Sequence, residues 1–573
     1  MREQLRRVRA AGESGFTTIV VISALLIGTL LVGAAFTIAQ GDTGPARSDQ
    51  YAKQAYAAAE AGVNFYLAHL LQDSDYWKNC YTVPAGASSY PVNRQGADFS
   101  SPSTRTQAVP GSQARYEIEL LNPRGQTGCS SGSSASIIDA STGRLSIRST
   151  GSYGGVRRSI VASFGRPGFL GFLWFTDKET QDPDTYSGGA PSTTCAQYYR
   201  DGRSSRCGDQ QFITGDSLNG PVHTNDIWYI GGRASFGRSG KGDALEATDP
   251  AGCRPSPSCL TTATWNGGLI KGAGLVGVPT ANASLKNYAS ADGVGSACAA
   301  TSPNCWLFTG PVHITLGANG VQVVGPTVLD SKGNPKAGST LKSGVGTWPP
   351  NGVIYVDNGN CKTTFPQTQT QVLTDSDADG TGSPGYPQGT GCGDAWVHGA
   401  AGRDVTVAAK NDVIIDGDIT HATTGVAVGL IPEGFVRVYH PCAYTKTTTG
   451  SGKNKKTTIT DSNWSTSPED PGVGYLADPK INAAILSLKH SFLVDNWGCG
   501  SNSGLGSLHV TGAIAQYYRG TVGTNDGSGN VASGYLKDYS YDATLKQHQP
   551  PYFLEPTNAT WELVSETEQV PAH

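Results

Sequence analysis

Carboxylates stand at alternate positions in one short acidic segment of the chain, which reads DSDADGT. This spacing lets a chain wrap oxygen ligands around Ca²⁺, and Gly380 would allow the sharp turn. Tyr386 stands where a helix–loop–helix calcium site has its closing Glu, and Asp394 could replace it. The alternative is an acidic turn that binds no metal. The predicted ligands are Asp375, Asp377, Asp379 and the carbonyl oxygen of Thr381.

A second set of acids, Asp412, Asp416 and Asp418, lies on a short strand-like segment. Paired carboxylates about 5–9.5 Å apart cleave glycosidic bonds, so these residues could serve a polysaccharide-degrading enzyme. Asn-Asp and Asp-Gly steps are also ordinary turn sequences, and the turn interpretation is favoured. The sequence shows no serine-hydrolase elbow, phosphate-binding loop or zinc-peptidase motif. We therefore expect no catalytic residues and no enzyme.

The chain has 12 cysteines, an even number that fits disulfide formation in an oxidising compartment. Neighbouring cysteines flank loops rich in Ser, Pro, Gly or Asn, which favours local pairs, although the sequence does not fix their connectivity. Cys80 with Cys129 and Cys442 with Cys499 would complete the set. The local candidates are Cys195 with Cys207, Cys253 with Cys259, Cys298 with Cys305, and Cys361 with Cys392.

Composition indicates a turn-rich β protein. Gly accounts for 75 of 573 residues, and charged residues for 15%, against about 25% in an average soluble protein. The formal net charge is −4 and the body of the chain has no basic patch, so nothing indicates nucleic-acid binding. Beyond Ca²⁺ we expect no cofactor.

A basic leader and a long apolar segment open the chain. Arg2, Arg6, Arg7 and Arg9 precede Phe16–Ala39, a segment without charged residues. As a helix with about 1.5 Å rise per residue it would span about 36 Å, enough for a hydrocarbon core of about 30 Å. The arginines predict a single-pass anchor with a cytoplasmic N-terminus. A cleaved secretory signal is the alternative, but its apolar region needs only about 7–15 residues. The anchoring side chains would include Ile19, Val20, Leu25, Leu26, Leu30 and Leu31.

Gly15 followed by Phe16 at the start of this segment resembles the class III leader of type IV pilins and pseudopilins. The resemblance implies that a prepilin peptidase cuts between these residues and methylates Phe16, and that the apolar helix later packs in a filament. Major pilins have Glu at the fifth mature position, whereas Val20 stands here. Minor pilins and tip-type pseudopilins are the members that tend to lack this Glu. The string AAEAG at residues 58–62 is similar to a signature of the PilX-type minor pilins.

A stalk and a head should follow the apolar segment. Gly41 and Gly44-Pro45 predict a break or kink in the helix. Residues 47–71 then place Ala, Gly, Val, Tyr and Leu at three- and four-residue spacing in one apolar stripe. Strand patterns at 115–121, 144–150 and 156–164 predict an antiparallel sheet that covers the stripe.

Short strand-like pieces separated by Gly, Asn and Asp fill much of the remaining chain, which is typical of parallel β-helix rungs. A β-sandwich is the alternative, because no strict period is visible. The predicted fold is mainly β with one long N-terminal α-helix. The expected segments are the leader 1–15, transmembrane helix 16–40, stalk helix 41–75, pilin-like head 76–165, aromatic and disulfide-containing linker 166–215, Gly-rich β domain 216–400, and β-helix-like rungs with a C-terminal tail 401–573.

These features predict a cell-membrane minor pilin or pseudopilin that displays a β-rich head at the cell surface, for assembly of or adhesion by a type IV pilus-like filament. Its expected partners are the lipid bilayer, other pilin subunits, prepilin peptidase, and a surface or host ligand for the head. Two alternatives stay open: a membrane-anchored β-helix enzyme acting on surface polysaccharide, and a surface adhesin that never enters a filament.

Overall fold

The computed structural model shows a mainly β chain with one long N-terminal helix, and its described residues form two compact units. The helix–sheet unit lies within residues 1–138, 145–165 and 561–573, and the parallel-strand unit within 139–144 and 166–560. The described residues are 14–73, 76–78, 89–91, 106–121, 138–139, 144–166, 168–185, 192–205, 207–325, 328–329, 335–336, 340–359, 393–440, 442–450, 456–463, 476–495, 497, 505–525, 531–546 and 548–572.

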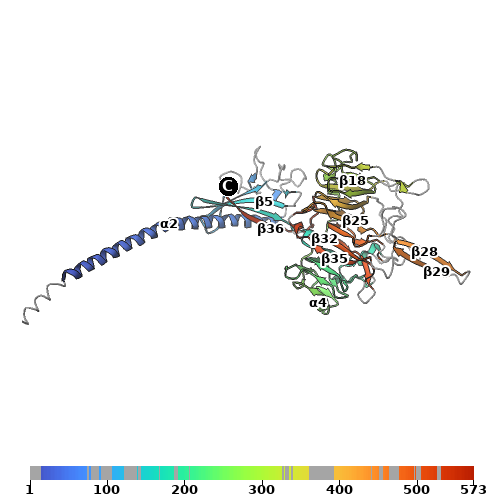
Figure 1. Cartoon of the computed structure of the whole chain (residues 1–573), viewed down its shortest axis with the longest axis horizontal. Helices are drawn as coiled ribbons and strands as arrows, with labels where there is room; N and C mark the ends of the chain where they lie inside the picture. The colour runs from blue at the N-terminus through green and yellow to red at the C-terminus, as the bar shows by residue number, and fades with distance from the viewer. Residues whose placement is uncertain are drawn as a thin grey trace, which may run out of the picture. The chain divides into compact units, whose positions relative to one another are not determined.

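The helix–sheet unit consists of helix α2 (Ser14–Gln72), a 3₁₀ turn η1 (Tyr76–Lys78) and an antiparallel sheet (Figure 1). Strand β36 comes from the end of the chain and pairs with β6. The parallel-strand unit is therefore inserted in sequence between two neighbouring strands of this sheet. The strands are β1 (Ser89–Pro91), β2 (Thr106–Ala108), β3 (Arg115–Leu121), β4 (Ile138–Asp139), β5 (Arg144–Tyr153), β6 (Val156–Gly165) and β36 (Glu562–Gln569).

Helix α2 packs its predicted stripe against this sheet. An added Cβ on Gly62 would lie 2.2 Å from Ser149 Oγ, and one on Gly151 would lie 1.9 Å from the carbonyl oxygen of Ala55. Helix and strand β5 thus approach so closely that glycine is needed on both. The buried residues of the stripe are Ala55, Ala58, Ala59, Val63, Tyr66 and Leu70.

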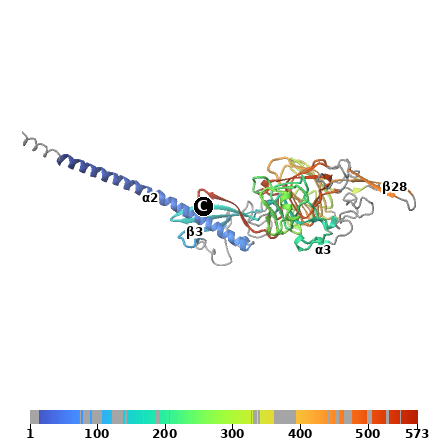
Figure 2. The same ribbon diagram turned by 90° about the horizontal axis from the view of Figure 1, so that it is seen from below.

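The helix has no break at Gly41 or at Gly44-Pro45, because α2 runs without interruption from Ser14 to Gln72. Figure 2 shows α2 as one continuous helix. A proline inside a helix removes one backbone hydrogen bond and its ring crowds the carbonyl one turn earlier, and a long helix can absorb both effects by bending. The predicted helices 16–40 and 41–75 are therefore one element.

The parallel-strand unit contains a 21-stranded sheet. Its described neighbours are parallel, except where β18 pairs antiparallel with β17 and β21. Its strands are β7 (Trp174–Gln181), β8 (Ser217–Asn219), β9 (Val222–Thr224), β11 (Ser235–Phe236), β12 (Leu245–Ala247), β14 (Thr264–Trp265), β15 (Ile270–Lys271), β16 (Leu307–Thr309), β17 (Val312–Leu316), β18 (Val321–Val324), β21 (Thr340–Lys342), β22 (Val353–Asp357), β23 (Ala395–Ala401), β24 (Val405–Ala409), β25 (Val413–His421), β26 (Val428–Pro432), β27 (Val436–Val438), β30 (Lys480–Ser487), β31 (Phe492–Val494), β32 (Ser507–Arg519) and β35 (Leu536–Tyr541).

The remaining strands and helices of the parallel-strand unit lie outside this sheet. Strand β10 (Trp228–Tyr229) pairs parallel with β13 (Cys253–Arg254). The antiparallel hairpins are β19 (Val328–Leu329) with β20 (Pro335–Lys336), β28 (Cys442–Thr449) with β29 (Lys456–Asn463), and β33 (Gly523–Asn525) with β34 (Val531–Gly534). The short helices are α3 (Ser192–Cys195), α4 (Cys259–Thr262), α5 (Lys286–Ala289), η4 (Phe169–Gly171), η5 (Pro183–Thr185), η6 (Tyr199–Asp201), η7 (Ala283–Leu285) and η11 (Ala543–Lys546).

One ladder of parallel strands runs in the order β15–β12–β9–β7–β32–β30–β26–β24–β22–β16. Its register aligns one column of apolar side chains, each at most 1% exposed. Fully burying side chains of this kind contributes about 1.5–3 kcal/mol each. The column consists of Leu245, Val222, Trp174, Ile514, Ile485, Leu430, Val407 and Ile354.

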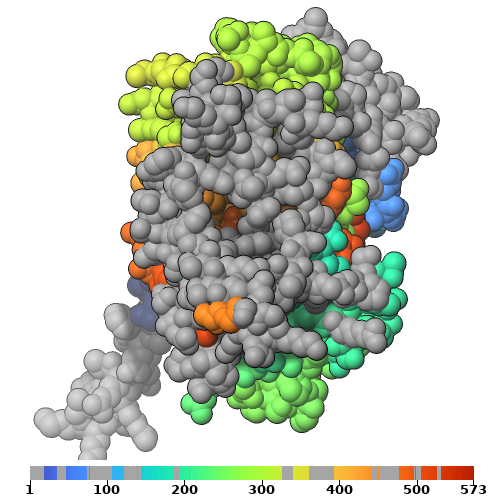
Figure 3. Space-filling view, turned by 90° about the vertical axis from the view of Figure 1, so that its right-hand side faces the viewer, coloured from blue at the N-terminus to red at the C-terminus, as the bar shows by residue number. Residues whose placement is uncertain are grey.

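The chain enters this ladder in its middle, because β7 comes first in sequence but lies between β9 and β32. It proceeds to β15 at one end, crosses along residues 272–305 to β16 at the other end, and returns strand by strand to β32. Figures 1 and 3 show the green residues around α4 and the yellow-green residues around β18 at opposite ends of the unit. The buried Asn282 fixes the crossing segment, since its Nδ2 donates to the carbonyl oxygens of Ala409 (2.8 Å) and Ile431 (2.7 Å).

Candidate functional site

The N-terminal stretch of α2 exposes apolar side chains all around the helix. The Thr29 hydroxyl donates to the carbonyl oxygen of Leu25 (2.9 Å), which satisfies this polar group within the helix. A helix that is apolar on all sides is typical of a buried environment, either a large core or a membrane. The six predicted anchor residues Ile19, Val20, Leu25, Leu26, Leu30 and Leu31 are 51–65% exposed.

Among the described residues, the structure contains no helix with the length and apolar character needed to cross a membrane.

Two predicted sites fall wholly or partly outside the described residues. The backbone of Gly15 and Phe16 belongs to the start of α2, while their side chains are not among those described. The Ca²⁺ ligands Asp375, Asp377, Asp379 and Thr381, together with Cys361 and Cys392, lie outside the described residues, so the Ca²⁺ site stays a prediction.

Asp394, the suggested extra Ca²⁺ ligand, is buried in the parallel-strand unit. Its Oδ1 accepts hydrogen bonds from Asn411 Nδ2 (2.5 Å) and the backbone N–H of Asp412 (3.1 Å). Burial and the neighbouring Asp412 charge raise the pKa of Asp394 to about 7. Oδ1 of Asp394 thus already accepts two hydrogen bonds within the protein.

Three of the expected local disulfides are present in the described parts of the chain. Their Cα–Cα distances of 5.5–5.9 Å lie in the usual range for a disulfide. All three close short loops of the parallel-strand unit. They join Cys195 to Cys207, Cys253 to Cys259, and Cys298 to Cys305.

The acids Asp412, Asp416 and Asp418 each have a partner of their own. Asp412 pairs with Arg437 (3.3 Å), Asp416 with His398 (2.9 Å), and Asp418 accepts from the backbone N–H of Lys480 (2.9 Å). Burial opposes ionisation of Asp416, but hydrogen bonds with His313 and His398 outweigh it and lower the pKa of this carboxyl. These separate contacts fit structural roles in the 21-stranded sheet.

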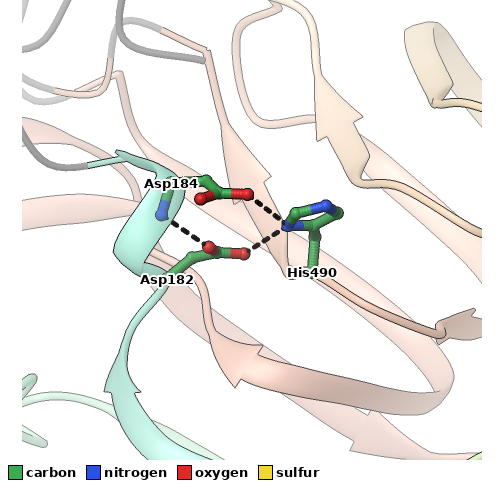
Figure 4. A group of neighbouring side chains, drawn as sticks. All are labelled: Asp182, Asp184 and His490. Carbon is green, nitrogen blue, oxygen red and sulfur yellow. Dashed lines mark hydrogen bonds and ion pairs between the residues drawn. The ribbon is translucent and has the colours of Figure 1, made fainter. Parts of the chain in front are cut away.

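A cluster of Asp182, Asp184 and His490 brings three metal-ligating side chains together (Figure 4). Asp182 directly follows β7, Asp184 lies in η5, and His490 stands in the loop between β30 and β31. Nδ1 of His490 is 2.8 Å from Oδ2 of Asp182 and 4.0 Å from Oδ2 of Asp184. The other oxygen of Asp182 accepts the backbone N–H of Asp184 (2.9 Å).

Burial and pairing set the charges of this cluster. Burial raises the pKa of Asp182, although the hydrogen bond with His490 opposes this. Burial also disfavours the charged His490 ring, but the hydrogen bond and charge of Asp182 outweigh it and raise the pKa of His490. The sequence offered only the Asp-x-Asp spacing as a signal, because His490 is 308 residues from Asp182.

A polar cavity of about 590 Å³ lies in the same unit, and Gln181, the residue before Asp182, is part of its wall. Its acid Asp209 is paired with Arg254 (2.7 Å) and Arg203 (3.5 Å). Its wall combines amides, hydroxyls, one indole and the ammonium group of Lys537, which suits a small polar ligand better than an apolar one. The lining also includes Gln210, Gln211, Thr214, Trp497 and Thr524.

Comparison with known proteins identifies no family for this chain. No known protein family matches the chain, and no curated protein matches it. Among solved structures it is similar to the competence-associated pilin ComZ from Thermus thermophilus, at 13% identity and a TM-score of 0.28. That similarity covers 91% of this chain and 98% of ComZ. A likeness this low does not identify a family.

Proposed function

We propose that the chain is a pilin-like membrane protein, a minor pilin or pseudopilin, anchored by Phe16–Ala39 and displaying a large β-rich head outside the membrane. The function is structural and adhesive rather than enzymatic. The subunit takes part in assembly of, or adhesion by, a type IV pilus-like filament.

The observation that carries this proposal is the change of environment along α2. Leu70, near the end of the helix, is 1% exposed under the sheet, whereas Leu30 is 65% exposed. Exposing a contiguous apolar surface to water is unfavourable, so the N-terminal stretch needs a partner of low polarity. Side chains are described for residues 18–34 of the apolar segment, which extends beyond them at both ends. A bilayer first, and neighbouring pilin helices later, would supply that partner.

The leader supports the same proposal. Four arginines stand before the apolar segment, and the first charge after it is Asp42. This asymmetry favours a cytoplasmic N-terminus and an extracytoplasmic head. Gly15-Phe16 would be the cleavage site of prepilin peptidase, and Val20 would make the mature subunit a low-copy or tip component.

For the head we propose a parallel β-solenoid. The parallel ladder of the 21-stranded sheet and its aligned apolar column support this architecture. The disulfides Cys195–Cys207, Cys253–Cys259 and Cys298–Cys305 suit exposure outside the cytoplasm. Such a head would present a rigid surface to a ligand on another cell or on a host.

Membrane fractionation tests the anchor. A charged side chain at the centre of a spanning helix costs about 2.5–3.5 kcal/mol, so the double change Leu25→Arg with Leu30→Arg should release the chain from the membrane pellet. The matched control is Val294→Arg with Val345→Arg, which alters two apolar side chains that are 71% and 89% exposed in the parallel-strand unit. The control should stay in the pellet with the wild type. Equal distribution of both double variants would contradict the proposal.

A further inference from the structure

We propose that Asp182, Asp184 and His490 form a binding site for a divalent transition-metal ion, with Zn²⁺ as the best match. The three ligand atoms, two carboxylate oxygens and one imidazole nitrogen, lie within 4.8 Å of one another. The pilin-like function does not depend on this site, and either proposal can fail without the other.

The distances suit a small tetrahedral ion. In a tetrahedral site, Zn–N and Zn–O bonds of about 2.0–2.2 Å place neighbouring ligand atoms about 3.3–3.6 Å apart. The separations from His490 Nδ1 to Asp182 and Asp184, 2.8 Å and 4.0 Å, lie on either side of that value. Asp184 is 44% exposed and can turn inward, while Asp182 is buried and fixed. A water molecule would take the fourth position, as in open zinc sites.

The charges and the types of ligand atom also match a divalent transition-metal ion. Two carboxylates and one neutral imidazole balance the charge of a divalent cation. An imidazole nitrogen suits Zn²⁺ and its transition-metal neighbours, whereas Ca²⁺ and Mg²⁺ prefer oxygen ligands alone. The bound metal ion would displace the proton shared between His490 Nδ1 and Asp182, because the imidazole nitrogen that binds a metal ion must have no proton.

The surroundings hold the ligands in place. The backbone N–H of Asp184 fixes Asp182, and the Phe435 ring stacks on the His490 ring with centroids 4.3 Å apart. The carbonyl oxygen of His490 accepts the backbone N–H groups of Tyr517 (3.0 Å) and Tyr518 (3.2 Å). The hydrogen bond to the Asp182 carboxylate is of the kind that orients metal ligands, while the other contacts fix the backbone and ring of His490.

A metal ion here would join two distant parts of the chain. Asp182 and Asp184 follow β7, where the chain enters the strand ladder, and His490 belongs to the loop before β31, late in the return path. The ion would therefore stabilise the junction between the start and the end of the parallel-strand unit. Ligand binding to the folded state alone raises its stability as RT ln(1 + [L]/Kd).

Calorimetric titration of the purified full-length chain in detergent, stripped with EDTA, tests the site with ZnCl₂ as the probe. The matched control is His509→Gln, which breaks another His–Asp pair (His509 Nδ1 to Asp538 Oδ2, 2.7 Å) that belongs to no described three-ligand cluster. Wild type and control should bind Zn²⁺ with a Kd of about 1 µM or lower, and binding should raise the melting temperature. Asp184→Asn should weaken binding about tenfold or more, and His490→Gln should abolish it.

Asp184→Asn keeps the buried pair of Asp182 and His490, so it tests the ligand role even if His490→Gln fails to fold. Co²⁺ gives a second readout, because its visible absorption bands should be present in wild type and weaker in Asp184→Asn. No Zn²⁺ binding at about 100 µM, a hundredfold above the expected Kd, would overturn the proposal. So would equal affinity of wild type and Asp184→Asn, or equally tight binding of Mg²⁺.

Discussion

Two stretches of helix α2 are both rich in apolar residues, yet their surroundings differ. The side chains of Ile19, Leu25 and Leu30 are 64–65% exposed, whereas those of Tyr66 and Leu70 are at most 1% exposed under the antiparallel sheet. The later stretch has apolar residues on one face with small ones among them, and the earlier stretch has apolar residues on every face. An apolar stripe indicates a helix that covers a sheet, and an apolar cylinder indicates a helix surrounded by apolar neighbours.

The largest contrast should come from removing one leucine from each stretch. Leu70→Ala leaves a cavity in the core of the helix–sheet unit and should lower its free energy of unfolding by about 2–5 kcal/mol. Leu30→Ala should change it by less than about 0.5 kcal/mol, because exposed substitutions rarely do more. Hydrogen exchange at the amides of β3 and β5 measures this quantity in the full-length chain. Equal protection in the two variants would show that the stretches do not differ as described.

Replacing a glycine in each stretch of the same helix tests the comparison further. One replacement should destabilise the unit, and the other should leave its stability unchanged or increase it. Gly62→Ala places a Cβ 2.2 Å from Ser149 Oγ and 2.9 Å from the Tyr116 ring, and should destabilise the unit by about 1–3 kcal/mol. A Cβ on Gly28 has nothing within 4 Å, so Gly28→Ala should be neutral or stabilising by up to about 1 kcal/mol. The same exchange measurement applies. If Gly28→Ala destabilised the unit as much as Gly62→Ala, a packed surface would have to lie against the N-terminal stretch of the helix.

The smallest effect on stability is expected at Val20, which is 51% exposed. Val20→Glu should leave the melting temperature of the full-length chain unchanged, because the Val20 side chain lies outside the described hydrophobic cores of both units. By the pilin resemblance, it should raise the share of this subunit in sheared filaments, since Glu at this position pairs with the N-terminus of a neighbour. Immunoblotting of sheared fractions against an abundant pilin measures the ratio. An unchanged ratio would show that Val20 does not limit incorporation.

Local patterns in the sequence predicted much of the fold. The stripe of Ala59, Val63 and Tyr66 is buried, and the strands expected at 115–121, 144–150 and 156–164 are β3, β5 and β6. These predictions succeeded because side-chain period is a local property. Within the aromatic and disulfide-containing segment 166–215, Leu173, Trp174 and Phe175 are buried in the core of the parallel-strand unit.

Long-range pairings could not be predicted in this way. Nothing in the local pattern of β36 shows that it returns to β6, and nothing in β7 shows that it stacks between β9 and β32. The Asp182–Asp184–His490 cluster depends on those pairings, because its members come together only when the late strands stack on β7. Loop closure over such separations leaves no mark on residue periodicity.

Mass spectrometry of the mature N-terminus tests the central claim most directly. The full-length chain is expressed together with a prepilin peptidase, recovered from membranes, and compared with a Gly15→Glu variant. The account predicts a wild-type chain that begins at methylated Phe16 and keeps its apolar segment, and an uncut variant. A wild-type chain that begins at Gln40, with the whole apolar segment removed, would contradict it.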